Sequence, residues 1–168
     1  FPFNSFANDE TFALAVGTTL IVPDGEMPYI APIVYIARTQ SIVSAGSGGT
    51  GQFIWPASGI ITQERTWYHT GIDIANAGAP EIIASDNGTV IKVAKEWYGY
   101  GWHVIIAHGN GFETLYGHLQ RIDVSVGQQI NKGQVLGRMG STGRSTGTHL
   151  HFEIKRSGTF ENPRTYLK

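Results

Sequence analysis

The chain has 168 residues and a formal net charge of −1, with 22 glycines, six histidines and no cysteine, and this length suits one ordinary domain, or one plus a short appendage. The absence of cysteine excludes disulfide frameworks, cysteine-type zinc fingers, iron–sulfur clusters and thiol nucleophiles, so a metal site must use histidine, carboxylate or backbone oxygen. The charge balance gives no basic field for nucleic acid, and no apolar run approaches the roughly 18 residues of a membrane span.

The first 45 residues differ from the rest, because they contain no histidine and no tryptophan. Residues 13–22 and 30–36 are apolar enough to predict two strands, and Pro32 restricts the second to a sheet edge. The start of the chain has neither the pattern of a signal peptide nor an initiator Met. We therefore expect a mature form or a part of a longer protein.

Small residues follow over Ser44–Gln52, with no apolar anchor among them. This composition is typical of a flexible linker, which we place at 46–52. The prediction is thus an N-terminal segment over 1–45, a linker, and a second domain over 53–168.

The second domain reads as short strands separated by glycine turns. Asn110-Gly111 is a hairpin-type dipeptide and predicts an antiparallel hairpin between its flanking strands. Asn162-Pro163 can start one helical turn, and no longer segment has helical periodicity. The predicted fold is all-β, a compact barrel- or sandwich-like domain of short antiparallel strands. The clearest predicted strands are 89–94, 102–107, 112–119 and 149–154.

Two histidine motifs in this domain suggest a metal site. His149 and His151 are two residues apart in a predicted strand, so both side chains lie on one face, about 6.6 Å apart. His69 and Asp73 can meet at one ion if the chain bends between them, which Gly71 permits. Two imidazoles and one carboxylate leave a fourth tetrahedral position open, as in a catalytic zinc site. One histidine of the pair at 149 and 151 then stays free beside the metal.

Ordinary structural roles are the alternative for each of these side chains. Asp73 could cap a turn, and His118 could be a hydrogen-bonded residue on an inward strand face. We assign such roles to His103, which lies in an apolar strand, and to His108, whose ring can bond to backbone before a turn.

Several blocks in fixed order resemble the zinc-dependent M23 peptidases, the lysostaphin- and LytM-like cell-wall endopeptidases. The resemblance runs through nearly all of Phe53 to Pro163 and opens with FIWPASGIIT. HTGIDIA, from His69, is similar to the family's H-x-G-x-D-[IL]-A block. Further similar blocks are Pro80 with IIASDNGTVIKV, HGNGFETLYGHL (108–119), VGQQINKGQVLGRMGSTGRSTGTHLHFEI (126–154) and Asn162-Pro163.

The resemblance implies one Zn²⁺ held by His69, Asp73 and His151, with His118 and His149 as catalytic histidines. It also implies an antiparallel β-sheet core with an active-site groove over the metal. It implies hydrolysis of peptidoglycan peptides by a zinc-activated water; one catalytic histidine would carry the proton and the other would stabilise the oxyanion. We expect an extracytoplasmic monomer, secreted, periplasmic or associated with the cell wall. The cleaved bond stays open among glycine cross-bridges, D-Ala-linked cross-links and other stem-peptide bonds.

Some features depart from the family pattern or are shared only in part. Before the first histidine the family often has a longer loop with an arginine, for which Arg65 is the sole candidate here. Residues 13–25 resemble the end of a LysM glycan-binding repeat, while a pro-segment is the other expectation for 1–45, with Asn4 and Asn8 as available metal-blocking residues. Aromatic residues near predicted loops could line the groove: Trp67, Tyr68, Trp97, Tyr98, Tyr100 and Trp102.

Two other functions compete with the peptidase. A catalytically inactive relative would bind the wall or activate a separate hydrolase; such relatives typically lose the metal ligands, which this chain keeps. A non-haem iron oxygenase also uses two histidines and one carboxylate, but its carboxylate usually stands two residues after the first histidine.

The glycine-rich run 137–149 lacks the Gly-Lys-Ser/Thr ending of a phosphate loop, and Lys132 lacks the neighbours of a lipoyl or biotinyl lysine. We expect Ser145 and Thr146 of that run near the groove.

Overall fold

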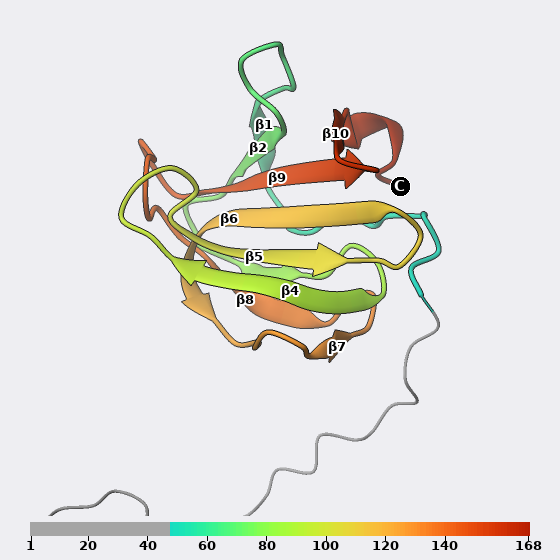
Figure 1. The fold of residues 1–168 in the computed structure, drawn as a ribbon. Helices are drawn as coiled ribbons and strands as arrows, with labels where there is room; N and C mark the ends of the chain where they lie inside the picture. The colour runs from blue at the N-terminus through green and yellow to red at the C-terminus, as the bar shows by residue number, and fades with distance from the viewer. Residues whose placement is uncertain (1–47) are drawn as a thin grey trace, which may run out of the picture. The chain divides into compact units, whose positions relative to one another are not determined.

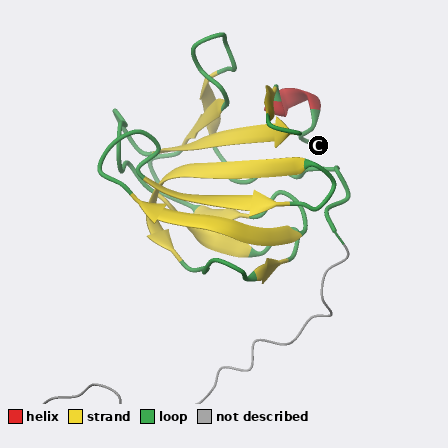
Figure 2. Ribbon diagram, in the orientation of Figure 1, coloured by secondary structure: helices red, strands yellow, loops and turns green. Residues whose placement is uncertain are grey.

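The computed structural model describes residues 48–168, which form ten short strands and one 3₁₀ turn (Figures 1 and 2). The strands are β1 (Ile60–Gln63), β2 (Ile72–Ala75), β3 (Glu81–Ile83), β4 (Gly88–Lys95), β5 (Trp102–Ala107), β6 (Phe112–Ile122), β7 (Gln129–Ile130), β8 (Val135–Met139), β9 (His149–Arg156) and β10 (Thr159–Glu161). The turn η1 (Pro163–Thr165) begins after Asn162, whose side chain accepts a hydrogen bond from the backbone N–H of Arg164. No helix in the described part of the chain has the length and apolar character needed to cross a membrane.

The strands join in one branched sheet in which every pairing between them is antiparallel. The main path runs β1-β2-β9-β6-β5-β4-β7, and Figure 1 shows β9, β6, β5 and β4 side by side with β8 behind them. β6 causes the branch, because its first part, Phe112–Gly117, pairs with β9, and its last part, from Leu119, pairs with β8. The expected all-β antiparallel fold is confirmed.

His118 stands where β6 changes partner, and its φ of 62° places it in the left-handed region. Such a backbone angle is uncommon and costly for a residue with a side chain. The register with β5 also slips here, since Tyr116 faces Val104 whereas Leu119 faces Trp102. The bulge bends β6, so that β6 pairs with β9 before His118 and with β8 after it. His118 itself stands outside the regular strand pairing.

The core lies between the layer formed by β9, β6, β5 and β4 and the strand β8 behind it (Figure 1). It is formed by apolar side chains from nearly every strand. β6 and β9 have neighbours on both edges and are covered on both faces, which explains their long buried stretches. Fully buried large side chains include Phe53, Ile72, Ile82, Ile106, Tyr116, Leu119, Leu136, Leu150 and Phe152. Burial of this apolar surface is the main source of stability in a domain without disulfides.

The predicted hairpin is present, with β5 and β6 joined through residues 108–111. The other strands predicted at 89–94 and 149–154 are β4 and β9, each slightly longer than expected. The remaining strands have no counterpart among these four predictions: β1, β2, β3, β7, β8 and β10. The predicted helical turn after Asn162 is present as η1.

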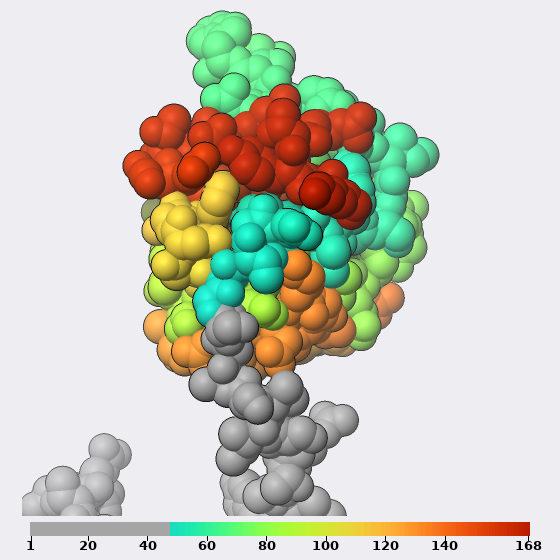
Figure 3. Space-filling model, turned by 90° about the vertical axis from the view of Figure 1, so that its right-hand side faces the viewer, coloured from blue at the N-terminus to red at the C-terminus, as the bar shows by residue number. Residues whose placement is uncertain are grey.

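The predicted segment 1–45 lies outside the described residues. Of the predicted linker, residues 48–52 are described, and they make hydrogen bonds with the domain. Gly49 donates to the carbonyl oxygen of His108 at 2.6 Å, and Lys132 donates to that of Gln52 at 2.7 Å. Figure 3 shows this first stretch, in turquoise, lying against the domain beside the C-terminal residues. These five residues are therefore bound to the domain, and the division into two domains stays a prediction.

Candidate metal centre

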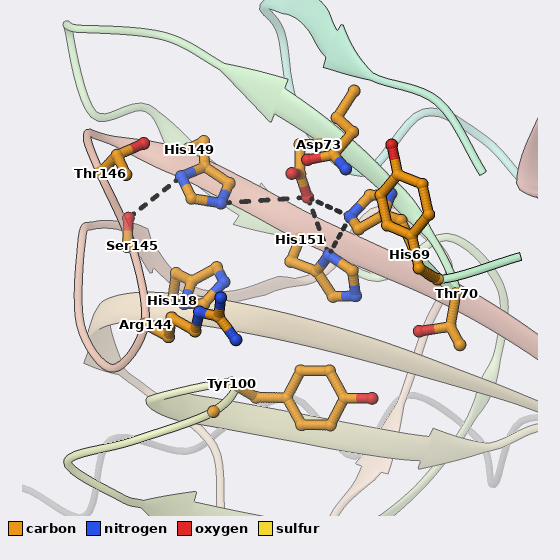
Figure 4. Close-up of a pocket in the computed structure, with 13 residues that line it drawn as sticks. His69, Thr70, Asp73, Tyr100, His118, Arg144, Ser145, Thr146, His149 and His151 are labelled. Carbon is orange, nitrogen blue, oxygen red and sulfur yellow. Dashed lines mark hydrogen bonds and ion pairs between the residues drawn. The ribbon is translucent and has the colours of Figure 1, made fainter. Parts of the chain in front are cut away.

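A pocket of about 610 Å³ opens on the side of the sheet where β2 and β9 meet the loops before β5 and β9 (Figure 4). It contains all the histidines that the sequence motifs singled out. Its lining residues are Gln63, Tyr68, His69, Thr70, Asp73, Gly99, Tyr100, His118, Arg144, Ser145, Thr146, His149 and His151.

Strand pairing places the two parts of the candidate metal site opposite each other. Asp73 on β2 is the direct partner of His151 on β9 in the antiparallel register. His69 lies in the loop just before β2, and the chain bends at Gly71 as expected. A Cβ atom at Gly71 would lie 2.2 Å from the carbonyl oxygen of Phe152, so glycine is required here for the close packing of this loop on β9.

Three donor atoms converge at this point. Nε2 of His69 lies 3.1 Å from both Oδ1 of Asp73 and Nδ1 of His151, and the latter two atoms are 2.8 Å apart. Ligands at about 2.0–2.1 Å from a tetrahedral zinc ion stand roughly 3.3 Å from one another, so these spacings suit such an ion. Two imidazole nitrogens and one carboxylate oxygen are also the donor types of catalytic zinc sites with one open position. The residues present therefore fit a zinc ion.

The far side of each imidazole is fixed by a further hydrogen bond. Nδ1 of His69 donates to the carbonyl oxygen of Glu64 at 3.0 Å, which directs Nε2 toward the cluster. Nε2 of His151 lies 3.1 Å from a carboxylate oxygen of Glu153, which directs Nδ1 toward the cluster. Such outer contacts set the tautomer and the ring orientation of metal-binding histidines.

Glu153 is a buried carboxylate at the centre of this outer shell. Its Oε1 accepts hydrogen bonds from Thr70 and, at 2.8 Å, from Tyr100. Burial raises the pKa of Tyr100 to about 12, with a contribution from Glu153, so the phenol remains a donor. Burial alone would raise the pKa of Glu153 too, but the hydrogen bonds from His151 and Thr70 lower it, and the group is ionised. The sequence interpretation missed Glu153, although strand alternation from His149 and His151 points to it.

The charges around His151 favour a cation at this position. Burial alone would lower the pKa of His151, but its hydrogen bonds to Asp73 and Glu153 raise it to about 9. Burial would raise the pKa of Asp73, yet its hydrogen bond with His151 lowers it. Two buried carboxylates thus flank one imidazole, an arrangement whose negative charge a divalent cation can balance.

The two remaining histidines of the pocket face each other, with ring centroids 4.6 Å apart. Nδ1 of His118 donates to the carbonyl oxygen of Thr142 at 2.7 Å, and Nδ1 of His149 donates to that of Gly147 at 2.8 Å. In each ring Nδ1 is thus taken up by backbone, which leaves Nε2 as the atom available to a bound molecule. Burial, with repulsion from His149 and His151, lowers the pKa of His118 to about 4, so His118 is neutral at neutral pH.

The two histidines that were assigned structural roles lie outside the pocket. His103 is buried and bonds through Nδ1 to the carbonyl oxygen of Gly101 at 2.9 Å. His108 is also buried, and its ring contacts the carbonyl oxygen of Asn87 and the hydroxyl of Thr114. Backbone bonding by His108 before the turn was expected from the sequence.

The other candidates for the groove divide into lining and exposed residues. Tyr68, Tyr100, Ser145 and Thr146 line the pocket, as does Arg144, which was not singled out. Trp67 and Trp97 are 93% and 91% exposed, Tyr98 is exposed as well, and none of the three lines the pocket. Trp102 packs against the core. Arg65 donates to the carbonyl oxygen of Phe160, away from the pocket.

Comparison with known proteins gives a match between residues 67–163 and peptidase family M23. The chain is 39% identical over 120 residues to a protein named lipoprotein NlpD/LppB homolog from Pseudomonas aeruginosa, covering 70% of this chain and 40% of that one. It is 32% identical over 143 residues to murein hydrolase activator NlpD from Salmonella typhimurium, covering 83% and 38%. It is 44% identical over 100 residues to DD-carboxypeptidase/endopeptidase Mpg from Neisseria meningitidis serogroup B, covering 59% and 23%.

A solved structure has the same fold. It is described as a zinc-containing peptidase from Vibrio cholerae, with a TM-score of 0.60 and 30% identity, and the likeness covers 69% of this chain and 39% of that one. The chain thus spans less than half the length of these relatives.

Proposed function

Because the chain belongs to peptidase family M23, we propose that it is a zinc-dependent endopeptidase acting on the peptides of bacterial cell-wall peptidoglycan. The observation that carries this proposal is the convergence of His69, Asp73 and His151 in one pocket with His118 and His149, whose Nδ1 atoms are held by backbone oxygens. A protein with only a binding role has no need for this combination of a metal-binding triad and two proton carriers. Its place of action is proposed to be outside the cytoplasm, where peptidoglycan lies.

The proposed reaction is addition of water to an amide. When bound, zinc supplies Lewis acidity, which lowers the pKa of water to about 7 and polarises a carbonyl oxygen. The water oxygen bonds to the carbonyl carbon, the C–N bond breaks, and the leaving nitrogen takes a proton. One of His118 and His149 accepts the water proton at Nε2 and delivers it to the leaving nitrogen, and the other, with a proton on Nε2, donates a hydrogen bond to the oxyanion. Glu153 and the carbonyl oxygen of Glu64 hold the metal-binding imidazoles in place.

Two substitutions separate metal binding from proton transfer. His69→Ala removes a ligand, so the purified protein is expected to lose its bound zinc and its hydrolysis of purified peptidoglycan. His149→Ala leaves the three ligands in place and is expected to retain about one zinc per chain while hydrolysis falls 10²- to 10⁴-fold. Elemental analysis and release of new amino groups measure the two effects. Hydrolysis by His69→Ala at the parent rate would disprove the metal assignment.

The similarity to murein hydrolase activator NlpD supports a second candidate, a module that activates a separate wall hydrolase. In that case the chain alone releases no amino groups from peptidoglycan, but it accelerates an added murein hydrolase. His69→Ala and His149→Ala would then accelerate that hydrolase as well as the parent does. The peptidase proposal requires hydrolysis by the chain alone and its loss in both variants.

A further inference from the structure

Arg144 brings an unusual charge into the pocket. Among the lining residues, only Asp73 and Arg144 carry a full charge at neutral pH in their ordinary states, and Asp73 is already surrounded by histidines. Figure 4 shows the Arg144 side chain reaching from the loop before β9 toward the middle of the pocket. With a divalent ion bound beside Asp73, the pocket would carry a net positive charge, to which Arg144 contributes.

The backbone at Arg144 is fixed by the loop before β5. The Arg144 N–H donates to the carbonyl oxygen of Gly99 at 2.9 Å. A Cβ atom at Gly143 would lie 2.3 Å from the backbone nitrogen of Gly101, so the two loops touch backbone to backbone. Thr142 adds two bonds, because its hydroxyl accepts from the Trp102 N–H at 2.9 Å and donates to the Leu119 carbonyl oxygen at 2.8 Å. The guanidinium is therefore presented from a rigid base.

The guanidinium of Arg144 is not engaged by another group of the described chain. Within residues 48–168 it makes no ion pair and no hydrogen bond, and its side chain is exposed to the pocket. The other arginines in this range all have a contact: a main-chain oxygen for Arg65 and Arg138, a carboxylate for Arg121 and Arg164, and an aromatic ring for Arg156. An arginine that is left free in a pocket is suited to bind a planar anion, above all a carboxylate in a bidentate manner.

The position of Arg144 indicates which part of a substrate it meets. The same loop holds both proton-carrying histidines, through the bond of Thr142 to His118 and a contact of Ser145 with His149 at 3.1 Å. One of these two histidines delivers the proton to the leaving nitrogen in the proposed reaction, and the loop that carries Arg144 contacts both of them. Arg144 thus belongs to the side of the pocket that receives the leaving residue.

We propose that Arg144 binds a free carboxylate on the carbon that carries the scissile nitrogen, and this inference rests on the proposed peptidase function. The substrates are then peptides whose leaving residue carries this free carboxylate. Two sources have this chemistry: a C-terminal amino acid, and the diamino acid of a direct cross-link, whose second carboxylate stands beside the linked nitrogen. Uncharged glycine bridges lack it and are disfavoured.

The test uses matched synthetic peptides with the zinc-loaded chain. One pair ends in a D-alanyl-amino acid with a free carboxylate or a carboxamide, and a second pair contains a direct cross-link whose diamino acid carries one or the other group. A glycine-bridged peptide is the uncharged reference. The variants are Arg144→Gln, Arg144→Lys and, as a control that removes the same charge outside the pocket, Arg121→Gln.

The expected result is a specific loss of carboxylate preference. Arg144→Gln should lower kcat/KM about tenfold or more for the free-carboxylate member of the cleaved pair, and less than about threefold for its carboxamide. Arg144→Lys should restore part of the preference, and Arg121→Gln should leave it unchanged. Which pair is cleaved identifies the source of the carboxylate. Equal losses on both members of a pair, or a parent that cleaves the glycine bridge best, would overturn the proposal.

Failure of the proposed function is distinguishable from failure of this inference. If the zinc-loaded parent cleaves none of the peptides, the peptidase proposal fails, and binding of the same pairs is measured by NMR titration. Binding that is about tenfold tighter for free carboxylates in the parent but not in Arg144→Gln still supports the role of Arg144. Binding that is equal for carboxylate and carboxamide refutes it.

Discussion

At the scale of single residues, the site depends on what holds the imidazoles as much as on the imidazoles themselves. Glu153 accepts hydrogen bonds from Thr70 and Tyr100 and contacts Nε2 of His151, and its side chain is fully buried. Its negative charge makes the imidazole of His151 more basic and fixes the tautomer that turns Nδ1 toward the cluster. A candidate metal site described by its three ligands alone would omit this residue.

Glu153→Gln is expected to weaken zinc binding 10- to 100-fold without removing a ligand. The amide keeps an acceptor oxygen and nearly the same shape, but it loses the charge that supports His151. Competition with a chromophoric chelator measures the affinity, and circular dichroism checks the fold. Glu81→Gln makes the same change at an exposed position outside the pocket and should leave zinc affinity unchanged. An unaltered affinity in Glu153→Gln would show that the hydrogen bond is only structural.

The sequence predicted the residues of the cluster better than their surroundings. The spacings are short, so local geometry was enough to suggest that His69 and Asp73 could meet at one ion and that His149 and His151 lie side by side, one as a ligand and one free. The contact of Tyr100 with Glu153 joins residues 53 positions apart, and no local pattern indicates it. The role of Arg144 was missed for the same reason, because its orientation depends on the packing of its loop against Gly99 and Gly101.

At the scale of elements, strand prediction succeeded where alternation or continuous burial lasted for six residues or more. β5 and β9 have this property, and the turn between β5 and β6 carries an Asn-Gly dipeptide. Strands of two to four residues, such as β3 and β7, are too short for a period and exist because a neighbouring strand pairs with them. The left-handed bulge at His118 was equally hidden, since nothing local to a histidine indicates a positive φ.

Asp86 is the anchor that attaches residues 48–52 to the loop between β3 and β4. Its buried carboxylate accepts from the Gly51 N–H at 2.9 Å and the Thr50 hydroxyl at 3.1 Å, and it lies 3.0 Å from Nζ of Lys132. Burial alone would raise the pKa of Asp86, but the hydrogen bonds from Lys132, Asn87, Gly51 and Thr50 lower it below its ordinary value. The folded state therefore binds a proton less readily than the unfolded chain does, and ionised Asp86 stabilises the fold.

Asp86→Asn is expected to lower the free energy of unfolding by about 2–3 kcal/mol at pH 7. The depressed pKa means that the contribution of Asp86 is complete above about pH 5 and is lost as the pH falls through its folded-state pKa. The difference between parent and variant in urea unfolding should thus shrink at acidic pH. Asp123→Asn, at an exposed ion pair, should cost less than about 0.5 kcal/mol. A difference that does not change with pH would contradict this account of Asp86.

At the scale of the whole molecule, the candidate ligands connect an edge of the sheet to its centre. The hairpin of β1 and β2 is the end of the main path, and it is attached to the rest through the pairing of β2 with β9. His69 and Asp73 belong to this hairpin, whereas His151 belongs to β9, which also pairs with β6. A metal ion held by all three would join the least supported hairpin of the sheet to its best supported strands.

Metal removal is therefore expected to lower stability and to do so unevenly. A ligand that binds only the folded chain at 100 times its Kd adds about 2.7 kcal/mol, which for a domain of this size corresponds to a Tm change on the order of 10 °C. Chelation should lower the Tm of the zinc-loaded parent by this amount and leave that of His69→Ala unchanged. Amide hydrogen exchange should accelerate first over residues 60–75 and least in the β5–β6 hairpin, because the latter does not depend on the ligands. Equal acceleration across the domain, or an equal Tm loss in His69→Ala, would mean that the ion does not bind between β2 and β9.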